Sequence, residues 1–183
     1  MVLRECPIAD SCVGGMICAN SSCESDKRKQ KFIKKVVHAF TGEAVCVFAE
    51  YADLANKTAE CALHRCKCLV TDPSKPPLIH IAGFSCKDLS KLKSMKGEQR
   101  ACVLSQRQGS SGTTFDALTK DLVTHEIPIY IGENVEELAN VKSDNLFYFL
   151  ETMREAGYAA VVQVLNAEDY KCAAKRKRSW IIA

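Results

Sequence analysis

Apolar residues recur along the chain in two patterns, one typical of amphipathic helices and the other of buried strands. Between residues 28 and 41, five apolar residues share one helical face, and Gly42 ends the predicted helix: Phe32, Ile33, Val36, Val37 and Phe40. Further helices are expected at residues 52–64, 113–124 and 143–157. Short apolar runs predict strands at residues 44–48, 68–70, 78–84, 127–131, 159–165 and 179–182. Strands alternating with helices at these lengths predict an α/β fold, a Rossmann-like doubly wound, mostly parallel sheet.

The chain divides into two predicted parts. Residues 1–26 carry Cys, Gly, Ser and Asn without clear periodicity, and we interpret them as a poorly ordered arm. Residues 27–183 form the globular domain, and 183 residues with 47% hydrophobic side chains suffice for one sizeable core. The polar segment 88–112 is long for a loop, which is typical of functional or mobile segments.

Charge and hydropathy exclude some classes of protein. No window of about eighteen apolar residues occurs, so no membrane partner is expected, and the N-terminus lacks a secretory pattern. The net charge of +3 is too small to imply nucleic acid. Basic residues do cluster at 27–35, 87–96 and 171–178, either as solvated faces or as phosphate-facing patches. These runs also suggest nuclear residence.

Cysteine usage points to an intracellular, reduced protein. Eleven cysteines, an odd number without a secretory signal, argue against a disulfide scaffold. Cys61, His64, Cys66 and Cys68 lie close together, but Cys-x-Cys without a second half is a poor tetrahedral zinc site. We therefore expect no metal.

One cysteine lies where open α/β sheets place their chemistry. Cys86 follows the predicted strand 78–84, beside Lys87 and ahead of a helix, and a thiol held there can act as a nucleophile. The alternative is a small buried hydrophobic residue. Glu50, Asp72 and Glu133 also follow predicted strands, so the sheet would bring four reactive side chains to one edge.

Four segments in order resemble motifs of the cytosine-C5 DNA methyltransferases. GFSCKDLS (83–90) resembles the family's catalytic Gly-Phe-Pro-Cys-Gln motif, and GENV (132–135) its Glu-Asn-Val motif. NAEDYKCAAKRKR (166–178) resembles the later Asn-Ala-x-x-Tyr-Gly-x-Pro-Gln-x-Arg-x-Arg segment, and GSSGTTF (109–115) the segment between the first two. Order and spacing agree over about residues 44–183.

The resemblance implies methyl transfer from S-adenosylmethionine to C5 of a cytosine flipped out of DNA. It assigns Cys86 as the nucleophile that adds to C6, and Glu133 as the acid that protonates or hydrogen-bonds N3. Asn134 would fix that loop. Arg176 would hold the base and orient the glutamate, with Arg178 as its partner.

The resemblance also implies a cofactor site. Glu50 would bind the ribose hydroxyls, Asp72 the adenine amino group, and Gly83 would line the same site. Without the resemblance, both carboxylates are equally well ordinary strand-end residues.

The sequence departs from the family at several positions. Ser85 replaces the proline before the cysteine, which rigidifies that loop, and Lys87 replaces a glutamine. Ala173, Ala174 and Lys171 replace Pro, Gln and Gly of the last motif. Residues 12–20 lie where the family has Phe-x-Gly-x-Gly.

The target-recognition region is expected to be missing, and a second chain could supply it. Alternatives are an inactive remnant that binds nucleic acid or a partner, a tRNA cytosine-C5 methyltransferase acting on RNA, and an unrelated thiol or zinc protein.

Overall fold

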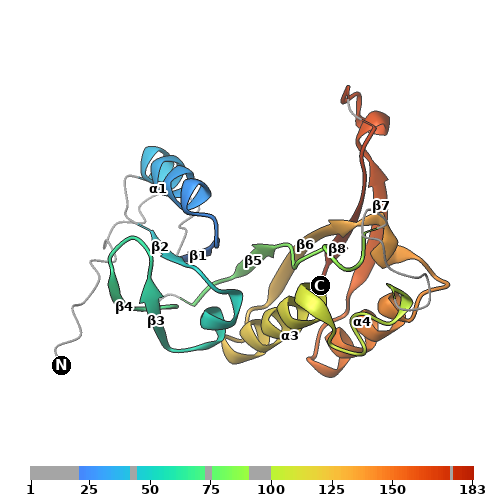
Figure 1. Ribbon diagram of the computed structural model, residues 1–183, viewed down its shortest axis with the longest axis horizontal. Coiled ribbons are helices and arrows are strands. Elements are labelled where there is room, and N and C mark those ends of the chain that lie inside the picture. Colours follow the sequence, from blue (N-terminus) through green and yellow to red (C-terminus); the bar gives the residue numbers. More distant parts are fainter. Residues whose placement is uncertain (1–20, 42–44, 73–75, 91–99, 174) are drawn as a thin grey trace. The chain divides into compact units, whose positions relative to one another are not determined.

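The computed structural model describes residues 21–41, 45–72, 76–90, 100–173 and 175–183, in two compact units. The N-terminal unit runs from Met1 to Pro77 and the C-terminal unit from Leu78 to Ala183 (Figure 1). Residues 1–20 of the predicted arm lie outside the described residues, so their lack of order stays a prediction. The end of that arm is structured, since residues 21–23 form a strand. None of the described helices has the length and hydrophobicity that crossing a membrane requires.

In its described residues, the N-terminal unit combines an α-helix and a short 3-10 helix with a small sheet. Its elements are β1 (Ser21–Cys23), α1 (Lys27–Thr41), β2 (Cys46–Phe48), the 3-10 helix η1 (Tyr51–Ala55), β3 (Thr58–Cys61) and β4 (Cys66–Leu69). The sheet order is β1-β2-β3-β4, with β1 parallel to β2 and the other neighbours antiparallel. β2 is buried along its length, as predicted.

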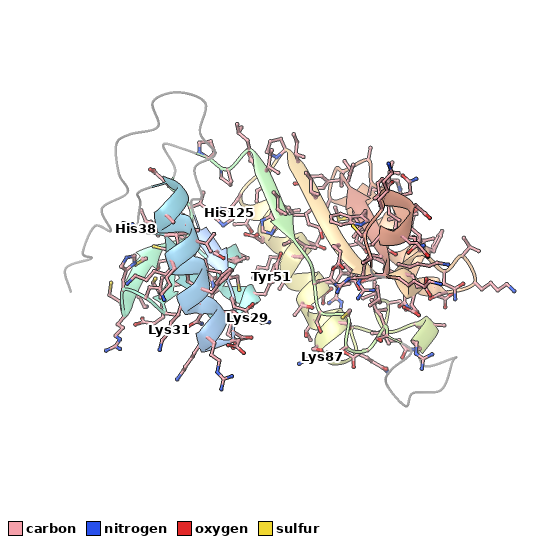
Figure 2. The ribbon with its side chains drawn as sticks, turned by 90° about the horizontal axis from the view of Figure 1, so that it is seen from above. Lys29, Lys31, His38, Tyr51, Lys87 and His125 are labelled. Atoms are coloured by element: carbon pink, nitrogen blue, oxygen red, sulfur yellow. The ribbon has the colours of Figure 1, made fainter. Side chains whose placement is uncertain are left out.

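Helix α1 confirms the helix predicted from residue 28 to residue 41. The Asp26 carboxylate caps it by accepting the amides of Arg28 and Lys29 at 2.7 and 3.2 Å. Its basic side chains, Lys29 and Lys31 among them, are exposed (Figure 2). The predicted apolar face is only partly buried, since Phe32 is 66% exposed. The basic run at 27–35 therefore lies on an exposed helix face, as both a solvated face and a phosphate-facing patch require.

The helix predicted at residues 52–64 is wrong. Seven of these residues belong to β3 and the turn after it, and β3 pairs with β4 in a tight hairpin: Thr58 faces Leu69 and Cys61 faces Cys66. Arg65 closes the turn with a φ of 54°. Strand pairing and burial of alternate side chains override the helical propensity of an alanine-rich segment.

The C-terminal unit combines two helices with a second sheet. Its elements are β5 (Ile79–Ala82), α3 (Gly109–Thr124), β6 (Ile129–Val135), η2 (Glu136–Ala139), α4 (Asp144–Glu155), β7 (Val161–Asn166), η3 (Ala167–Tyr170) and β8 (Lys177–Ile182). Their order confirms the helices and strands predicted for this part. The sheet order is β5-β6-β8-β7 (Figure 1). Ser143 caps α4 as predicted, accepting the amide of Asn145.

The core of this unit lies between the sheet and its helices. Phe115 of α3 packs against Phe149 of α4 and against Phe84, with ring centroids 5.1 and 5.2 Å apart. His80 of β5 reaches the Asp121 carboxylate of α3 at 3.2 Å, so α3 lies on the sheet face that carries His80. The aromatic cluster therefore joins both helices to the segment that follows β5.

The α/β class is confirmed, but the doubly wound, mostly parallel sheet is not. In the C-terminal sheet β5, β6 and β7 run in one direction, and β8 lies between β6 and β7 antiparallel to both. The short connection through η3 allows β8 only to turn back on β7.

The strand predicted at 78–84 is confirmed as β5, but its expected burial is wrong. β5 forms the edge of its sheet, and Ile81 is 77% exposed.

Candidate active site

Cys86 lies on a loop at the carboxyl end of β5. The chain leaves β5 at Ala82, and the buried ring of Phe84 anchors the loop in the core. The amides of Leu89 and Ser90 both donate to the Cys86 carbonyl, at 3.2 and 3.0 Å, which closes a tight turn behind the thiol. The Cys86 side chain is exposed, so it is available to a substrate rather than being a core residue.

Glycine at position 83 allows the loop to approach strand β6. A Cβ atom at Gly83 would lie 2.8 Å from the Glu133 carbonyl oxygen, closer than side chains tolerate. The approach places the Cys86 loop directly against the strand that carries Glu133 and Asn134. The role expected for Gly83 in cofactor binding stays a prediction.

Asn134 joins the loop to β6 by a hydrogen bond. Its side chain is buried, and its Nδ2 donates to the Phe84 carbonyl at 3.1 Å. Its Oδ1 accepts the amide of Val135 at 2.9 Å. Because both ends of the amide are used, Asn134 holds the segment before Cys86 in a fixed position relative to β6.

Glu133 is oriented by two arginines from the end of the chain. Arg178 of β8 donates from Nε to Glu133 Oε1 at 2.9 Å, and Arg176 lies 3.4 Å from the same oxygen. Strand pairing explains this geometry, since Arg178 lies opposite Val135 and the carboxylate reaches across two residues. The Glu133 side chain is 37% exposed, so a ligand can still contact it.

The loop is also fixed to the start of α3, through residues that the sequence reasoning did not select. The Ser85 amide donates to Thr114 Oγ1 at 2.9 Å, and the Ser85 and Ser110 hydroxyls share a hydrogen bond of 2.9 Å. Asp88, which is 3% exposed, accepts the Ser111 amide at 2.9 Å, while Ser111 Oγ accepts the Asp88 amide at 3.0 Å.

This reciprocal pair caps α3 from a distant segment, in the manner of a capping box. The sequence pattern that could have indicated this contact is the group of small hydroxyl residues within 110–114.

The structure places Lys87 in solvent beside Cys86 (Figure 2). Among the described residues, no hydrogen bond joins its ammonium group to the thiol.

Glu50 and Asp72 belong to the N-terminal unit. Glu50 is exposed and lies two residues after the end of β2. Its carbonyl accepts the Asp53 amide at 3.1 Å where η1 begins. Asp72 is half-buried and follows β4. Since β2 and β4 are both antiparallel to β3, they end at the same edge of their sheet. The expected meeting of these carboxylates with Cys86 and Glu133 stays a prediction.

The C-terminal unit thus presents an exposed thiol on a fixed loop that packs against strand β6, whose Glu133 carboxyl group is held by two arginines. A thiol and an oriented carboxyl group are suited to covalent catalysis. A sequence profile of the C-5 cytosine-specific DNA methylases matches residues 76–183, which is more than half of the chain. The chain belongs to this family, and the resemblance seen in its motifs is confirmed.

Individual relatives match more than half of the chain. The type II methyltransferase M.MspI of Moraxella sp is 29% identical over 103 residues, covering 56% of this chain and 23% of the relative. M.Sau3AI of Staphylococcus aureus is 31% identical over 106 residues, covering 55% and 24%. The chain thus spans roughly a quarter of the length of these relatives.

Solved structures support the fold over a longer stretch. The S. pombe Dnmt2 methyltransferase has a TM-score of 0.50 at 12% identity, covering 88% of this chain and 40% of that one. A prophage protein from E. coli assigned as a DNA modification methyltransferase has a TM-score of 0.51 at 15% identity, covering 89% and 39%. At such identities the likeness shows a methyltransferase fold and nothing about substrate.

Proposed function

We propose that this chain carries the catalytic core for transfer of a methyl group from S-adenosylmethionine to C5 of cytosine in DNA. The observation that carries the proposal is the contact of the Glu133 carboxylate with Arg178 and Arg176. Glu133 belongs to β6, and Asn134 of the same strand holds the Cys86 loop. A carboxyl group oriented by two guanidinium groups beside an exposed thiol matches the chemistry that a pyrimidine ring requires.

Each of these residues has a defined step. The Cys86 sulfur, as thiolate, forms a bond to C6 of the ring, and the displaced electron pair makes C5 nucleophilic. Glu133 donates a hydrogen bond or proton at N3, where negative charge would otherwise develop. Bound S-adenosylmethionine supplies the methyl group for C5. Loss of the C5 proton to a base then breaks the C6–sulfur bond and returns the thiolate.

The target base has to leave the duplex for this chemistry, because C6 is inaccessible in a base stack. Arg176, which is 60% exposed at its side chain, is suited to hold the extruded ring while Arg178 keeps Glu133 aligned. A second chain that supplies target recognition is part of the same proposal.

The N-terminal unit offers residues that fit the cofactor. Glu50 and Asp72 follow strands that end at the same sheet edge, and two carboxylates there can accept hydrogen bonds from ribose hydroxyls and from an adenine amino group. A doubly wound methyltransferase sheet is proposed with it, supported by the likeness to S. pombe Dnmt2. Nuclear residence is proposed from the basic runs alone.

Covalent trapping tests the proposal directly. The chain is incubated with S-adenosylmethionine and a DNA oligonucleotide that contains 5-fluorocytosine, which blocks the loss of the C5 substituent. We expect an adduct that survives denaturation, is lost in Cys86→Ala and is retained in Cys172→Ala, an exposed cysteine of the same unit.

The other outcomes separate the alternatives. An adduct with RNA but not with DNA would replace the DNA proposal by the alternative hypothesis, a tRNA cytosine-C5 methyltransferase. Absence of any adduct from folded chain, with either nucleic acid, would contradict catalysis and support a binding remnant.

A further inference from the structure

Three thiols and an imidazole of the N-terminal unit converge on one point. The Nδ1 atom of His64 lies 3.3 Å from the sulfur of Cys61 and 3.6 Å from the sulfurs of Cys46 and Cys68. All four potential ligand atoms lie within 4.8 Å of one another. None of these residues belongs to the catalytic motifs, so the cluster needs a separate explanation.

Strand register explains how the cluster arises. Phe48 of β2 lies opposite Cys61 of β3, so Cys46, two residues before Phe48, points to the same sheet face as Cys61. Cys61 in turn lies opposite Cys66, and Cys68 therefore shares this face as well. The hairpin turn at residues 62–65 then brings His64 over the three sulfurs.

The spacing of the ligand atoms fits a tetrahedral zinc ion. With Zn–S bonds of about 2.3 Å and Zn–N bonds of about 2.0 Å, the sulfur and nitrogen atoms of a tetrahedral site lie about 3.5 Å apart. The three sulfur–nitrogen distances, 3.3, 3.6 and 3.6 Å, bracket this value. Three cysteines and one histidine are also a donor set that zinc prefers among biological metals.

The surroundings of the cluster fit metal-bound thiolates better than cysteines that only fill a hydrophobic core. Cys46, Cys61 and Cys68 are 6%, 0% and 2% exposed and belong to the apolar core of the unit. The Val47 amide nonetheless donates to the Cys61 sulfur at 3.4 Å, as peptide groups do around metal-bound thiolates. Four protein ligands in a buried position leave no open place for a substrate, which is the arrangement of a structural site.

We propose that Cys46, Cys61, His64 and Cys68 bind one zinc ion, which fastens strand β2 to the β3–β4 hairpin. The need for it follows from size, since the strands of this sheet have only three or four residues each. Such short strands bury little apolar surface, and small units of this kind commonly depend on a metal for stability. The site does not rest on the proposed methyl transfer.

Cys66 provides a matched control. Its sulfur lies 3.9 Å from that of Cys68 and it shares the same sheet face, yet it is outside the four-ligand cluster. The zinc content of the chain, purified with reductant, is measured by elemental mass spectrometry. We expect one zinc ion per chain for the unsubstituted protein and for Cys66→Ser, and at least a tenfold lower content for Cys61→Ser.

A conservative exchange separates ligation from simple loss of folding. His64→Cys keeps four ligands and is expected to retain one zinc ion, whereas His64→Asn loses it. The unsubstituted chain, stripped with a chelator and titrated with Co²⁺ under reduction, is expected to saturate at one equivalent with the intense visible absorption of tetrahedral thiolate coordination.

Three results would overturn the proposal: no metal in the purified chain together with only weak, octahedral-type cobalt absorption; loss of zinc in Cys66→Ser with retention in Cys61→Ser; or equal zinc content in all variants.

Discussion

The Ser85 amide donates a hydrogen bond to Thr114 Oγ1, at 2.9 Å, and this bond fixes the residue directly before the candidate nucleophile to helix α3. Ser85 occupies the position at which the catalytic motif of the family has proline. Proline has no amide hydrogen and restricts the loop through its ring. Here the restriction comes from hydrogen bonds instead, since the Ser85 hydroxyl also pairs with Ser110.

Thr114→Val removes the acceptor of this bond while keeping the shape of the side chain. The Ser85 amide is then left without its partner, and we expect a loss of about 1–2 kcal/mol in the free energy of unfolding. Adduct formation with 5-fluorocytosine DNA should slow by about tenfold, because the thiol is less well positioned. Thr114→Ser retains the hydroxyl and serves as the control. Equal adduct rates in both variants would show that the bond does not position Cys86.

Arg178→Ala tests whether the contact with Glu133 serves chemistry rather than stability. Both side chains are about one third exposed, so solvent screens the ion pair and unfolding should change by less than about 1 kcal/mol. The rate of adduct formation should fall by about 10²-fold, as for loss of one oriented group in an active site.

Arg154→Ala, which removes another exposed arginine–glutamate pair, should leave the adduct rate unchanged. Large destabilisation by Arg178→Ala with a normal rate in the folded fraction would contradict this assignment.

Local patterns in the sequence were enough to predict most helices and strands of the C-terminal unit. The face of α3 at Phe115, Leu118 and Leu122 is buried as its spacing indicates, and Ser143 caps α4. The exception is Val123, which lies at the border of the apolar stripe and is 52% exposed. Helical periodicity fixes which side of a helix faces the core, but not how wide the covered stripe is.

Contacts between segments far apart in the sequence were harder to predict. The motifs select Glu133 and Arg178, but the sequence does not reveal that Asp88 caps α3 from 23 residues away. The proposed zinc site was rejected from the sequence, because Cys61, His64, Cys66 and Cys68 offered a Cys-x-Cys pair without a second half. Three of its residues lie within one hairpin, but the segment was predicted as a helix, and the fourth ligand is Cys46 on β2 rather than the nearby Cys66.

Buried titratable groups between β5 and α3 make stability depend on pH. Burial lowers the pKa of His80 from 6.5 to about 4, so unfolding takes up a proton between these values and stability falls on acidification. Burial raises the pKa of Asp121 from 3.8 to about 6, so the folded state takes up a proton first and stability rises on acidification. The two effects oppose each other between about pH 4 and pH 6.

Asp121→Asn separates these effects, because asparagine resembles the protonated acid in shape. The variant removes the Asp121 effect and also the carboxylate that favours the protonated form of His80. Both changes act in the same direction, so the variant should lose stability more steeply than the unsubstituted chain between about pH 6 and pH 4. Urea unfolding, followed by the fluorescence of the single tryptophan, Trp180 of β8, measures this in the C-terminal unit. A variant with the shallower profile would contradict the direction given for Asp121.

Two neighbouring isoleucines of β8 offer a last, sharply matched test. Ile181 is 0% exposed and faces the helix-covered core, whereas Ile182 is 63% exposed on the other side of the sheet. Ile182 lies opposite Val161, itself 66% exposed, so this face carries apolar side chains that the described residues leave uncovered. Ile181→Ala should cost about 2–5 kcal/mol, since it leaves a cavity in the core.

Ile182→Ala removes the same atoms from a solvated position and should cost less than about 1 kcal/mol. Urea unfolding followed by Trp180 fluorescence compares the two variants in the same unit. Because exposed apolar patches promote association, Ile182→Ala should also reduce self-association at high concentration, measured by light scattering. Similar destabilisation by both substitutions would mean that the second face is covered in solution, as a doubly wound sheet requires.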